Sequence, residues 1–266
     1  MVERSGRAKG KSLKQKLLGS HQRCWIWGRN LVCETLRGGN WPILELYLAN
    51  DLAADELRTA TELAGTYQTQ LHVEDRERLT QLAHTAEHQG YLAKMPPFPY
   101  LSAEKILQQQ AALPLYLILD SIQDPYNLGA MLRSAEVFGV DGVFIGTERQ
   151  VGVTSLVARS SAGAVSRVPL AQALDLVQLA TTLRSQGIFV AGASETGSIE
   201  LSAFDFRRPA AVVIGNEGAG ISAALRACCD AFVRIHHAGA ISSLNAAAAA
   251  AVVLYEAGRQ RKEDGL

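Results

Sequence analysis

The second half of the chain alternates short apolar runs with helical patterns. The runs are LYLILD (115–120), DGVFIG (141–146), RVPL (167–170), GIFVAGAS (187–194), AAVVIGNE (210–217) and FVRIHH (232–237). Between them, stretches such as LGAMLRSAEVFG (128–139) and AQALDLVQLATTLRSQG (171–187) repeat apolar residues at helical spacing. Apolar strands that alternate with helices predict a parallel sheet covered on both faces. Ligands of such sheets bind outside the carboxyl ends of the strands, so the residues after each strand are the candidates for chemistry.

The first half predicts a smaller α/β module. A short helix begins at Asn30 and ends at Gly38-Gly39, ILELYLAN (43–50) alternates like a half-buried strand, 54–67 is helical and QLHVED (70–75) is a second strand. The module contains no evident catalytic cluster. His84 and His88 stand at i, i+4 spacing and could in principle hold a metal, but with no third ligand nearby we interpret them as surface residues.

Proline and charge divide the chain further. Pro96, Pro97 and Pro99, followed by a glutamine-rich stretch, predict a stiff, poorly packed connector. Residues 1–18 carry six Lys or Arg against one Glu, although the whole chain has zero net charge. Such an arm is either an electrostatic footprint for phosphate backbones or a solubilising tail. We therefore predict a basic arm (1–20), a small α/β domain (21–98), a linker (99–112) and a larger α/β domain (113–266).

Composition narrows the setting. The chain has 266 residues, of which 48% are hydrophobic, and no window of about 18 uninterrupted apolar residues that would span a membrane. The basic N-terminus lacks the apolar segment of a signal peptide, so we expect a cytoplasmic protein. The four cysteines form no C-x-x-C pair, and we expect reduced thiols and no metal site.

Three segments after predicted strands could carry chemistry. In DSIQDPYNLGAMLRSAEVFG (120–139), Asn127 is a candidate cap for a helix that starts near Leu128, and Arg133 points off its apolar stripe near the carboxyl rim of the sheet. On its own, Arg133 reads equally as an exposed helix residue. VVIGNEGAGIS (212–222) is a glycine-rich loop between a strand and a helix near Ile221, either a ligand cradle or a tight turn. It matches neither a dinucleotide fingerprint nor a phosphate loop, which argues against a nicotinamide oxidoreductase.

The third segment ends in a bare helix. In VRIHHAGAISSLNAAAAAAVVLYE (233–256) a strand is expected to end at His236-His237, and six alanines follow Asn245. A serine or asparagine at a helix start ordinarily satisfies orphan amides. A nucleophilic serine would need a histidine base, and although His236 and His237 are near in sequence, no G-x-S-x-G elbow is present. Hydrolase chemistry is therefore disfavoured.

Taken together, NLGAMLRSAEVFG, IGNEGAGIS and SSLNAAAAAAV resemble the three motifs of the SpoU/TrmH family of RNA ribose 2′-O-methyltransferases, in the same order and spacing. WGRN, ELYLAN and HQGYLAKM resemble the substrate-binding domain of its rRNA guanosine branch. The resemblance implies a trefoil-knotted α/β domain of the SPOUT class, S-adenosylmethionine as methyl donor, an RNA substrate and a homodimer. In that fold the small side chains of the third motif let backbones pass closely within the knot and the dimer contact.

The resemblance also assigns the site. It implies polar active-site roles for Asn127, Arg133, Glu217, Ser243 and Asn245, and it implies cofactor contacts for Gly215, Gly218, Ile235, His237 and Leu244. Two positions depart from the family: His236-His237 stand where it usually has Pro-Met or Pro-Leu, and Ala246 stands where a valine commonly follows Leu-Asn. The family assigns Arg133 to proton removal or its assistance. Because a guanidinium is a reluctant base, binding a phosphate or the developing alkoxide suits it better.

Two alternatives remain open. A tRNA guanosine in place of 23S rRNA keeps the chemistry, and the extra N-terminal module favours rRNA. A catalytically silent RNA-binding protein on the same scaffold is disfavoured by the complete polar set. The strongest expectation is therefore methylation of a ribose 2′-hydroxyl in RNA.

Overall fold

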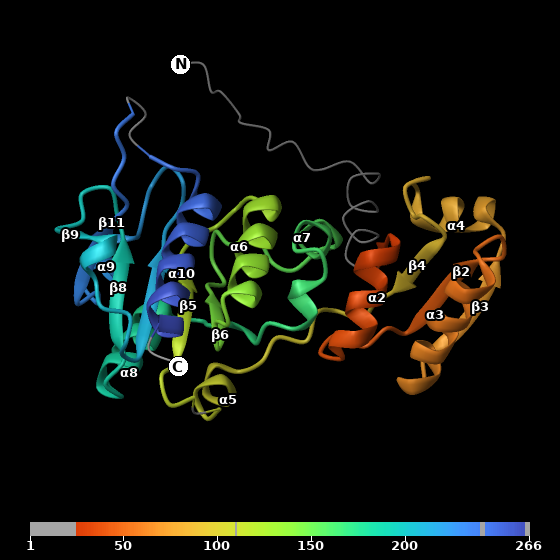
Figure 1. Cartoon of the computed structure of the whole chain (residues 1–266), viewed down its shortest axis with the longest axis horizontal. Coiled ribbons are helices and arrows are strands. Elements are labelled where there is room, and N and C mark those ends of the chain that lie inside the picture. Colours follow the sequence, from red (N-terminus) through yellow and green to blue (C-terminus); the bar gives the residue numbers. More distant parts are fainter. Residues whose placement is uncertain (1–24, 110, 240–242, 264–266) are drawn as a thin grey trace, which may run out of the picture.

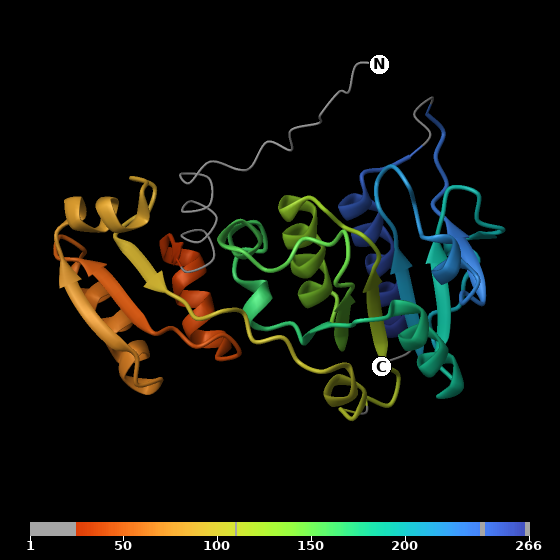
Figure 2. The ribbon, with the colours of Figure 1, turned by 180° about the vertical axis from the view of Figure 1, so that it is seen from behind.

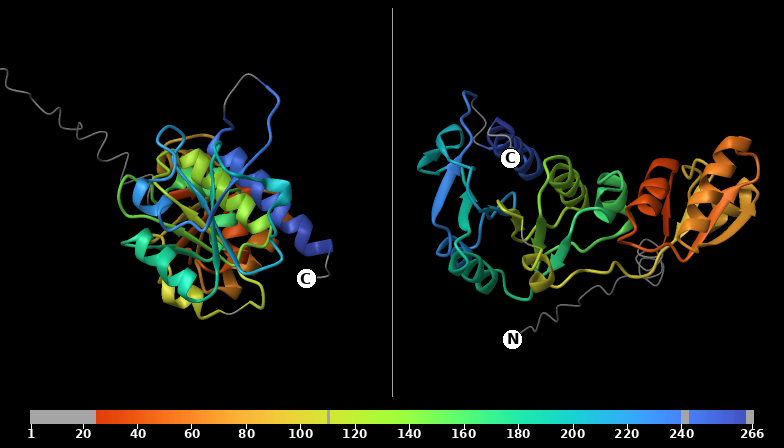
Figure 3. Two further views of the ribbon diagram at one scale, coloured as in Figure 1. Left: turned by 90° about the vertical axis from the view of Figure 1, so that its left-hand side faces the viewer. Right: turned by 60° about the horizontal axis from the view of Figure 1, so that its bottom comes forward.

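A computed structural model describes residues 25–109, 111–239 and 243–263, which form two sheets side by side along the long axis (Figures 1 and 3). The first sheet has the order β1-β4-β2-β3 and consists of β1 (Trp25–Trp27), β2 (Glu45–Ala49), β3 (Gln70–Glu74) and β4 (Tyr91–Lys94). The pair β2–β3 is parallel, whereas β4 runs antiparallel to both β1 and β2. We call this unit, up to residue 98, the N-terminal domain.

Alternating side chains give the first sheet two apolar faces. On one face, Ile26, Leu46 and Leu48 pack in a cluster with residues of α2 (Arg29–Gly38) and α3 (Ala54–Thr66). On the other, Trp27 and Leu92 pack against α4 (Arg76–Ala83). The two helices and two strands predicted in this domain are confirmed, and Gly39 ends α2 in the left-handed conformation, at φ 70°.

The second sheet is wholly parallel, with the order β7-β6-β5-β10-β8-β11-β9. Its strands are β5 (Leu115–Leu119), β6 (Gly142–Ile145), β7 (Leu170–Gln172), β8 (Phe189–Ala193), β9 (Ile199–Glu200), β10 (Ala210–Ile214) and β11 (Ala231–Arg234). The predicted parallel sheet is therefore confirmed. We call this unit, residues 113–263, the C-terminal domain.

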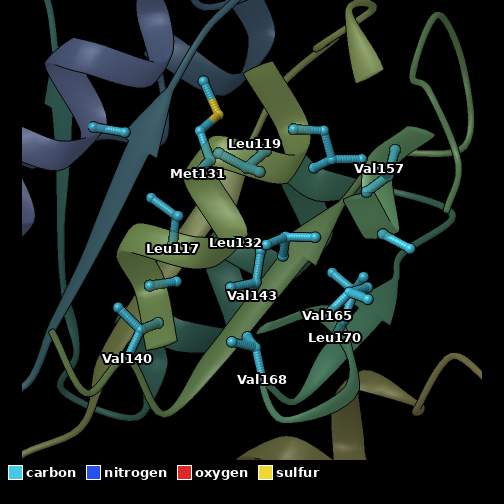
Figure 4. Packing of buried hydrophobic residues seen from close by; sticks show 14 of the residues in the cluster. Leu117, Leu119, Met131, Leu132, Val140, Val143, Val157, Val165, Val168 and Leu170 are labelled. Atoms are coloured by element: carbon cyan, nitrogen blue, oxygen red, sulfur yellow. The ribbon is translucent and has the colours of Figure 1, made fainter. Parts of the chain in front are cut away.

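Helices cover both faces of the second sheet. On one face lie α6 (Pro125–Val137), α7 (Ser155–Ser160), the 3₁₀ turn η1 (Ala164–Ser166) and α10 (Ala246–Glu263), and Figure 4 shows Met131 and Leu132 of α6 packed over the strands. On the other face lie α5 (Ala103–Leu107), α8 (Leu176–Ser185) and α9 (Ala223–Arg226), seen from behind in Figure 2. A further turn, η2 (Leu201–Ala203), follows β9. None of the helices in the described ranges is both long and apolar enough to cross a membrane.

The connector is packed, contrary to our expectation. Leu101 forms a parallel bridge with Ala171, and Ile106 of α5 is fully buried. The Tyr100 hydroxyl accepts a hydrogen bond from the Val153 amide at 2.7 Å, and Phe98 lies edge-on to both Trp41 and Tyr100. The prolines therefore stiffen a segment whose intervening apolar residues fasten it to both domains.

Side chains also join the two domains directly. The Arg159 guanidinium of α7 lies 3.0 Å from a Glu87 carboxylate oxygen and 5.1 Å from the centre of the Trp27 ring. Arg167 pairs with Glu34 of α2 at 2.7 Å. A Cβ on Gly38 would lie 2.7 Å from the Ser166 carbonyl oxygen, so α2 and η1 are in close backbone contact.

Four local expectations are corrected. The helix expected near Leu128 begins at Pro125, because proline suits the first helical position, and its cap is Asp124 and not Asn127. The last strand ends at Arg234, not at the two histidines, and α9 begins at Ala223 rather than near Ile221.

The histidines expected at the surface differ from each other. His84 follows the end of α4 in the left-handed conformation, so it does not share a helix with His88. The ring of His88 is buried; its Nδ1 accepts the Gly90 amide at 3.0 Å and its Nε2 lies 3.0 Å from the Thr80 hydroxyl. His88 is therefore a turn-stabilising core residue and not a surface histidine.

Candidate active site

A cavity of about 550 Å³ opens where β10, β8 and β11 end. The carboxyl ends of these strands lie at the upper edge of the sheet in Figure 1. The cavity lies outside the carboxyl ends of the strands, where the pattern predicted a ligand site. Its lining mixes apolar and polar groups, which suits a ligand that carries both a planar base and charged substituents. The apolar side is formed by Ile214, Ile221, Val233, Ile235, Leu244 and Ala249, and the polar side by Ser194, Glu195, Thr196, Glu217, Arg226, His236, His237 and Ser243.

The glycine-rich loop folds back on itself beside the cavity. Asn216 and Gly220 exchange two backbone hydrogen bonds of 3.1 and 2.8 Å, and Gly220 has φ 67°. The side-chain oxygen of Asn216 also accepts the amides of Gly218 and Ala219. A Cβ on Gly215 would lie 2.2 Å from the Gly220 carbonyl carbon, so only glycine fits there. The loop is thus a rigid turn, and it also lines the ligand cavity.

A hydrogen-bonded chain joins the three motifs. Asn127 is the third residue of α6, where its side chain donates to a Glu217 carboxylate oxygen. Its own oxygen accepts a hydrogen bond of 3.1 Å from the Asn245 amide group. These residues lie 90 and 118 positions apart from Asn127 in sequence. The structure therefore brings Asn127, Glu217 and Asn245 together at one end of the sheet.

Asn245 has a second role as a helix cap. Its side-chain oxygen accepts the Ala247 amide at 2.9 Å and the Ala248 amide at 3.2 Å, which satisfies orphan donors of α10. Because the same side chain caps α10 and binds Asn127, the orientation of the asparagine pair is coupled to the packing of α10 on α6. The alanines allow this packing: Ala246, Ala247 and Ala250 are buried.

The candidate cofactor residues all line the cavity. Gly215, Gly218, Ile235, His237 and Leu244 do so, together with the polar candidates Glu217 and Ser243. His236 and His237, the departure from the family pattern, lie at its rim, with Nδ1 of His237 3.3 Å from the Ile235 carbonyl oxygen.

Arg133 lies apart from this cluster. It is the ninth residue of α6, about 12 Å along the helix axis from Pro125, so it is not at the carboxyl rim as expected. Its side chain is exposed, and it is not among the described residues that line the cavity. Around it, Tyr126 and Val137 are 62% and 63% exposed, and Ala130 lies between them at helical spacing. Arg133 therefore interrupts an outward-facing apolar stripe.

Sequence reasoning missed several groups at the same edge. Buried Asp120, directly after β5, accepts the Ser222 amide at 2.7 Å and so anchors the glycine-rich loop. Glu195 and Thr196 follow β8, and Arg226 lies with its guanidinium 4.3 Å from the Phe232 ring centre. Asp120, Glu195 and Thr196 follow strands, so the signal that selected the other candidates would have found them.

The described residues contain no group of three or more His, Cys, Asp or Glu side chains placed to hold a metal ion. Burial raises the pKa of the Cys229 thiol to about 11, and burial also raises the pKa of the Cys33 thiol. None of the cysteines in the described part of the chain lines the cavity.

The fold and the cavity define an α/β enzyme whose ligand binds across the carboxyl edge of a parallel sheet. The family model "SpoU rRNA Methylase family" matches residues 114–255, and the model "RNA 2'-O ribose methyltransferase substrate binding" matches residues 25–101. The chain belongs to the SpoU rRNA methylase family, which confirms the resemblance of the three motifs.

Individual relatives agree over most of the chain. It is 34% identical over 239 residues to the 23S rRNA (guanosine-2'-O-)-methyltransferase RlmB of Shewanella oneidensis, covering 89% of this chain and 97% of that protein. The AdoMet complex of the SpoU methyltransferase AviRb from Streptomyces viridochromogenes has a TM-score of 0.76 at 28% identity, covering 95% of this chain and 94% of that one. The AdoMet-bound rRNA methyltransferase from Sinorhizobium meliloti has a TM-score of 0.77 at 25% identity, covering 93% and 91%.

Proposed function

We propose that this protein transfers a methyl group from S-adenosylmethionine to a ribose 2′-hydroxyl of RNA, at a guanosine of 23S rRNA, in the cytoplasm. The observation that carries the proposal is the Asn127–Glu217–Asn245 chain, which joins all three motifs beside the cavity. Family membership and the similarity to an rRNA guanosine methyltransferase over nearly the full chain support the substrate.

The cavity fits the cofactor. Its volume of about 550 Å³ lies in the range of small-molecule sites, and its lining combines apolar residues with polar groups that include Glu195 and Arg226. Because only glycine fits at position 215, the backbone lines the cavity there without a side chain. We assign cofactor binding to Gly215, Gly218, Ile235, His237 and Leu244. S-adenosylmethionine supplies an electrophilic methyl group when bound.

The polar residues would position the nucleophile. A ribose 2′-hydroxyl is a weak nucleophile, so alignment of its oxygen supplies much of the rate, with effective molarities of about 10⁵ M or more. Asn127 is held by Asn245 and by Glu217, which lines the cavity, as Ser243 also does. We assign these residues to orienting the ribose and assign Arg133 to binding the RNA phosphate or the developing alkoxide.

A second copy of the chain would complete this arrangement. Tyr126 and Val137 on α6 and Val252 and Tyr255 on α10 are exposed, and the Tyr255 ring lies edge-on to Phe138, which makes one surface of the two helices. Large exposed apolar patches mark association sites. We propose that two copies pair through this surface, which carries Arg133, and that Val252→Asp shifts the mass in sedimentation from dimer to monomer. A wild-type monomer would contradict the proposed pairing.

We assign RNA binding to the N-terminal domain, helped by the basic arm, and methyl transfer to the C-terminal domain. The arm lies outside the described residues, so its contribution stays a prediction. Phosphate contacts from Lys and Arg predict binding that weakens steeply with salt. The knotted threading also stays a prediction, supported by the small buried residues Ala246, Ala247 and Ala250 where α10 packs against α6.

The test is methyl transfer from labelled S-adenosylmethionine to total rRNA and total tRNA, followed by mapping of the labelled nucleotide. Label at a guanosine 2′-oxygen in 23S rRNA is the expected result. Label in tRNA alone would keep the enzyme and overturn the substrate. No label in either RNA, with cofactor binding intact, would overturn the proposed reaction and favour a silent RNA-binding protein.

A further inference from the structure

Three rings form a continuous layer across the first sheet. The rings of Tyr47 and His72, on the neighbouring strands β2 and β3, are stacked with centroids 4.6 Å apart and planes within 16°. On the other side of Tyr47, the Trp25 ring lies at 5.7 Å and 54°. The 4.6 Å spacing matches the distance between paired strands, so the Tyr47 and His72 rings stand side by side on the sheet.

Strand register places these rings on one face. One row of register partners runs across the sheet through Trp27, Leu92, Tyr47 and His72. Trp25 lies two residues from Trp27 and therefore on the same face of its strand. Helix α4 buries only part of this face, where Leu79 packs against Trp27, Ala49 and Leu92. Trp25, Tyr47 and His72 remain half-buried.

The row of rings ends at His72 because β3 is the last strand of the sheet. One face of the His72 ring lies on Tyr47, and among the described strands none pairs with β3 on the opposite side. The side chain is 30% exposed, and its Nε2 is buried 4.0 Å from a Glu45 carboxylate oxygen. The inner edge of the ring is thus held toward the sheet, and a further planar group could stack on its outer face.

A cationic side chain lies beside the row. Lys94, between Trp25 and Glu45 in the register, pairs with the Glu45 carboxylate and is 42% exposed. Residues 1–18, with six Lys or Arg and one Glu, precede Trp25 closely in the chain. An aromatic surface next to cationic groups suits a nucleic acid strand, whose bases stack and whose phosphates are attracted.

We propose that this aromatic row is a binding site for unpaired RNA bases, with one base stacking on the outer face of His72. The proposal rests on the proposed RNA substrate and names the surface that binds it. Four-stranded sheets elsewhere bind single-stranded RNA by stacking bases on exposed aromatic rings. The bases of a duplex are stacked on one another and are not free to stack on protein rings. The site therefore binds loops and single strands more tightly than duplexes.

The test measures how tightly the full-length protein binds a single-stranded oligoribonucleotide and the corresponding duplex. Binding is measured by fluorescence anisotropy of the labelled RNA. Loss of one base stack weakens binding about tenfold or more. We expect His72→Val to weaken single-strand binding by about that factor with little change for the duplex, and His72→Phe, which keeps a flat ring, to restore it. The matched control is Val73→Ala, on the opposite face of the same strand and 52% exposed, which should bind as the wild type does.

Equal single-strand binding by wild type and His72→Val would overturn the site. An equal loss for single strand and duplex would also overturn it, because it would show a role in folding or charge alone. Unchanged tryptophan emission of the variant excludes unfolding, since all three tryptophans lie in this domain. If no RNA is methylated but the His72 variants still differ, the proposed reaction fails and the binding site stands. If RNA is methylated but wild type and all His72 variants bind it equally, the proposed reaction stands and the binding site fails.

Discussion

The two domains use the same kinds of element but carry their polar and aromatic groups in different places. In the C-terminal domain, Asn127, Glu217 and Asn245 meet at the carboxyl edge of a sheet whose faces are both covered by helices. In the N-terminal domain, α4 leaves part of one sheet face uncovered, and Tyr47 and His72 stack there. Strand ends fix a few groups closely enough for chemistry, whereas a sheet face offers area for stacking. In the proposed function, the C-terminal domain carries catalysis and the N-terminal domain carries RNA affinity.

The largest expected effect breaks catalysis and leaves binding intact. Arg133→Ala should lower kcat by about 10² to 10³, the usual effect of removing a group that stabilises developing charge. Cofactor affinity, measured by calorimetry, should stay within about twofold because Arg133 is not among the described residues lining the cavity. The control is Glu136→Ala, exposed on the same helix, which should retain its turnover. Wild-type turnover in Arg133→Ala would remove Arg133 from the site.

The second effect separates two glycines of one loop. A Cβ at Gly215 would meet the Gly220 backbone at 2.2 Å, whereas a Cβ at Gly218 would meet only the Asn216 side-chain oxygen, at 3.6 Å. Gly215→Ala should therefore weaken S-adenosylmethionine binding by about tenfold or more, and Gly218→Ala by less than about threefold. Calorimetric titration checks both variants. Equal affinity of the two would contradict a cavity formed by the folded loop.

A third prediction concerns acid stability. Burial lowers the pKa of His88 from 6.5, and the positive charge of Arg76 lowers it further. The unfolded chain then binds the proton more tightly, so the stabilisation is present above pH 6.5 and is lost as pH falls toward the lowered native pKa. Urea unfolding followed by tryptophan emission reports this domain alone. The urea concentration at the midpoint of unfolding should decrease as the pH is lowered below 6.5. In His88→Gln the midpoint should depend less on pH.

The smallest effect lies at the contact between the domains. The Arg159–Glu87 pair is exposed, with Glu87 71% accessible, so it contributes about 0–1 kcal/mol, and the Trp27 ring adds about 0.5–1 kcal/mol. Arg159→Ala should therefore lower the tryptophan-monitored unfolding free energy by about 1 kcal/mol. Arg58→Ala, on α3, is a control for loss of charge. A loss far above 2 kcal/mol would mean that docking stabilises the N-terminal domain much more than these contacts predict.

Local patterns predicted most of the elements but not the contacts that join them. The apolar runs at 115–120 and 210–217 contain adjacent parallel strands, and Leu128, Leu132 and Ala135 of the helical pattern that follows the first run are buried. The pairing of Asn127 with residues 90 and 118 positions away depends on how the strands are ordered, which periodicity does not encode. The same applies to the aromatic row, whose rings come from β1, β2 and β3. The prediction of a poorly packed connector was wrong because it relied on the prolines, which do not indicate that Ile106 is buried.

The division of roles between the two domains is tested most directly by methyl transfer as a function of RNA concentration, measured in parallel for Asn127→Ala and His72→Val. We predict that Asn127→Ala lowers kcat by about 10² or more at nearly unchanged KM for RNA. We predict that His72→Val raises KM by about tenfold at nearly unchanged kcat. A fall in kcat for His72→Val equal to that for Asn127→Ala, at unchanged KM, would contradict the account.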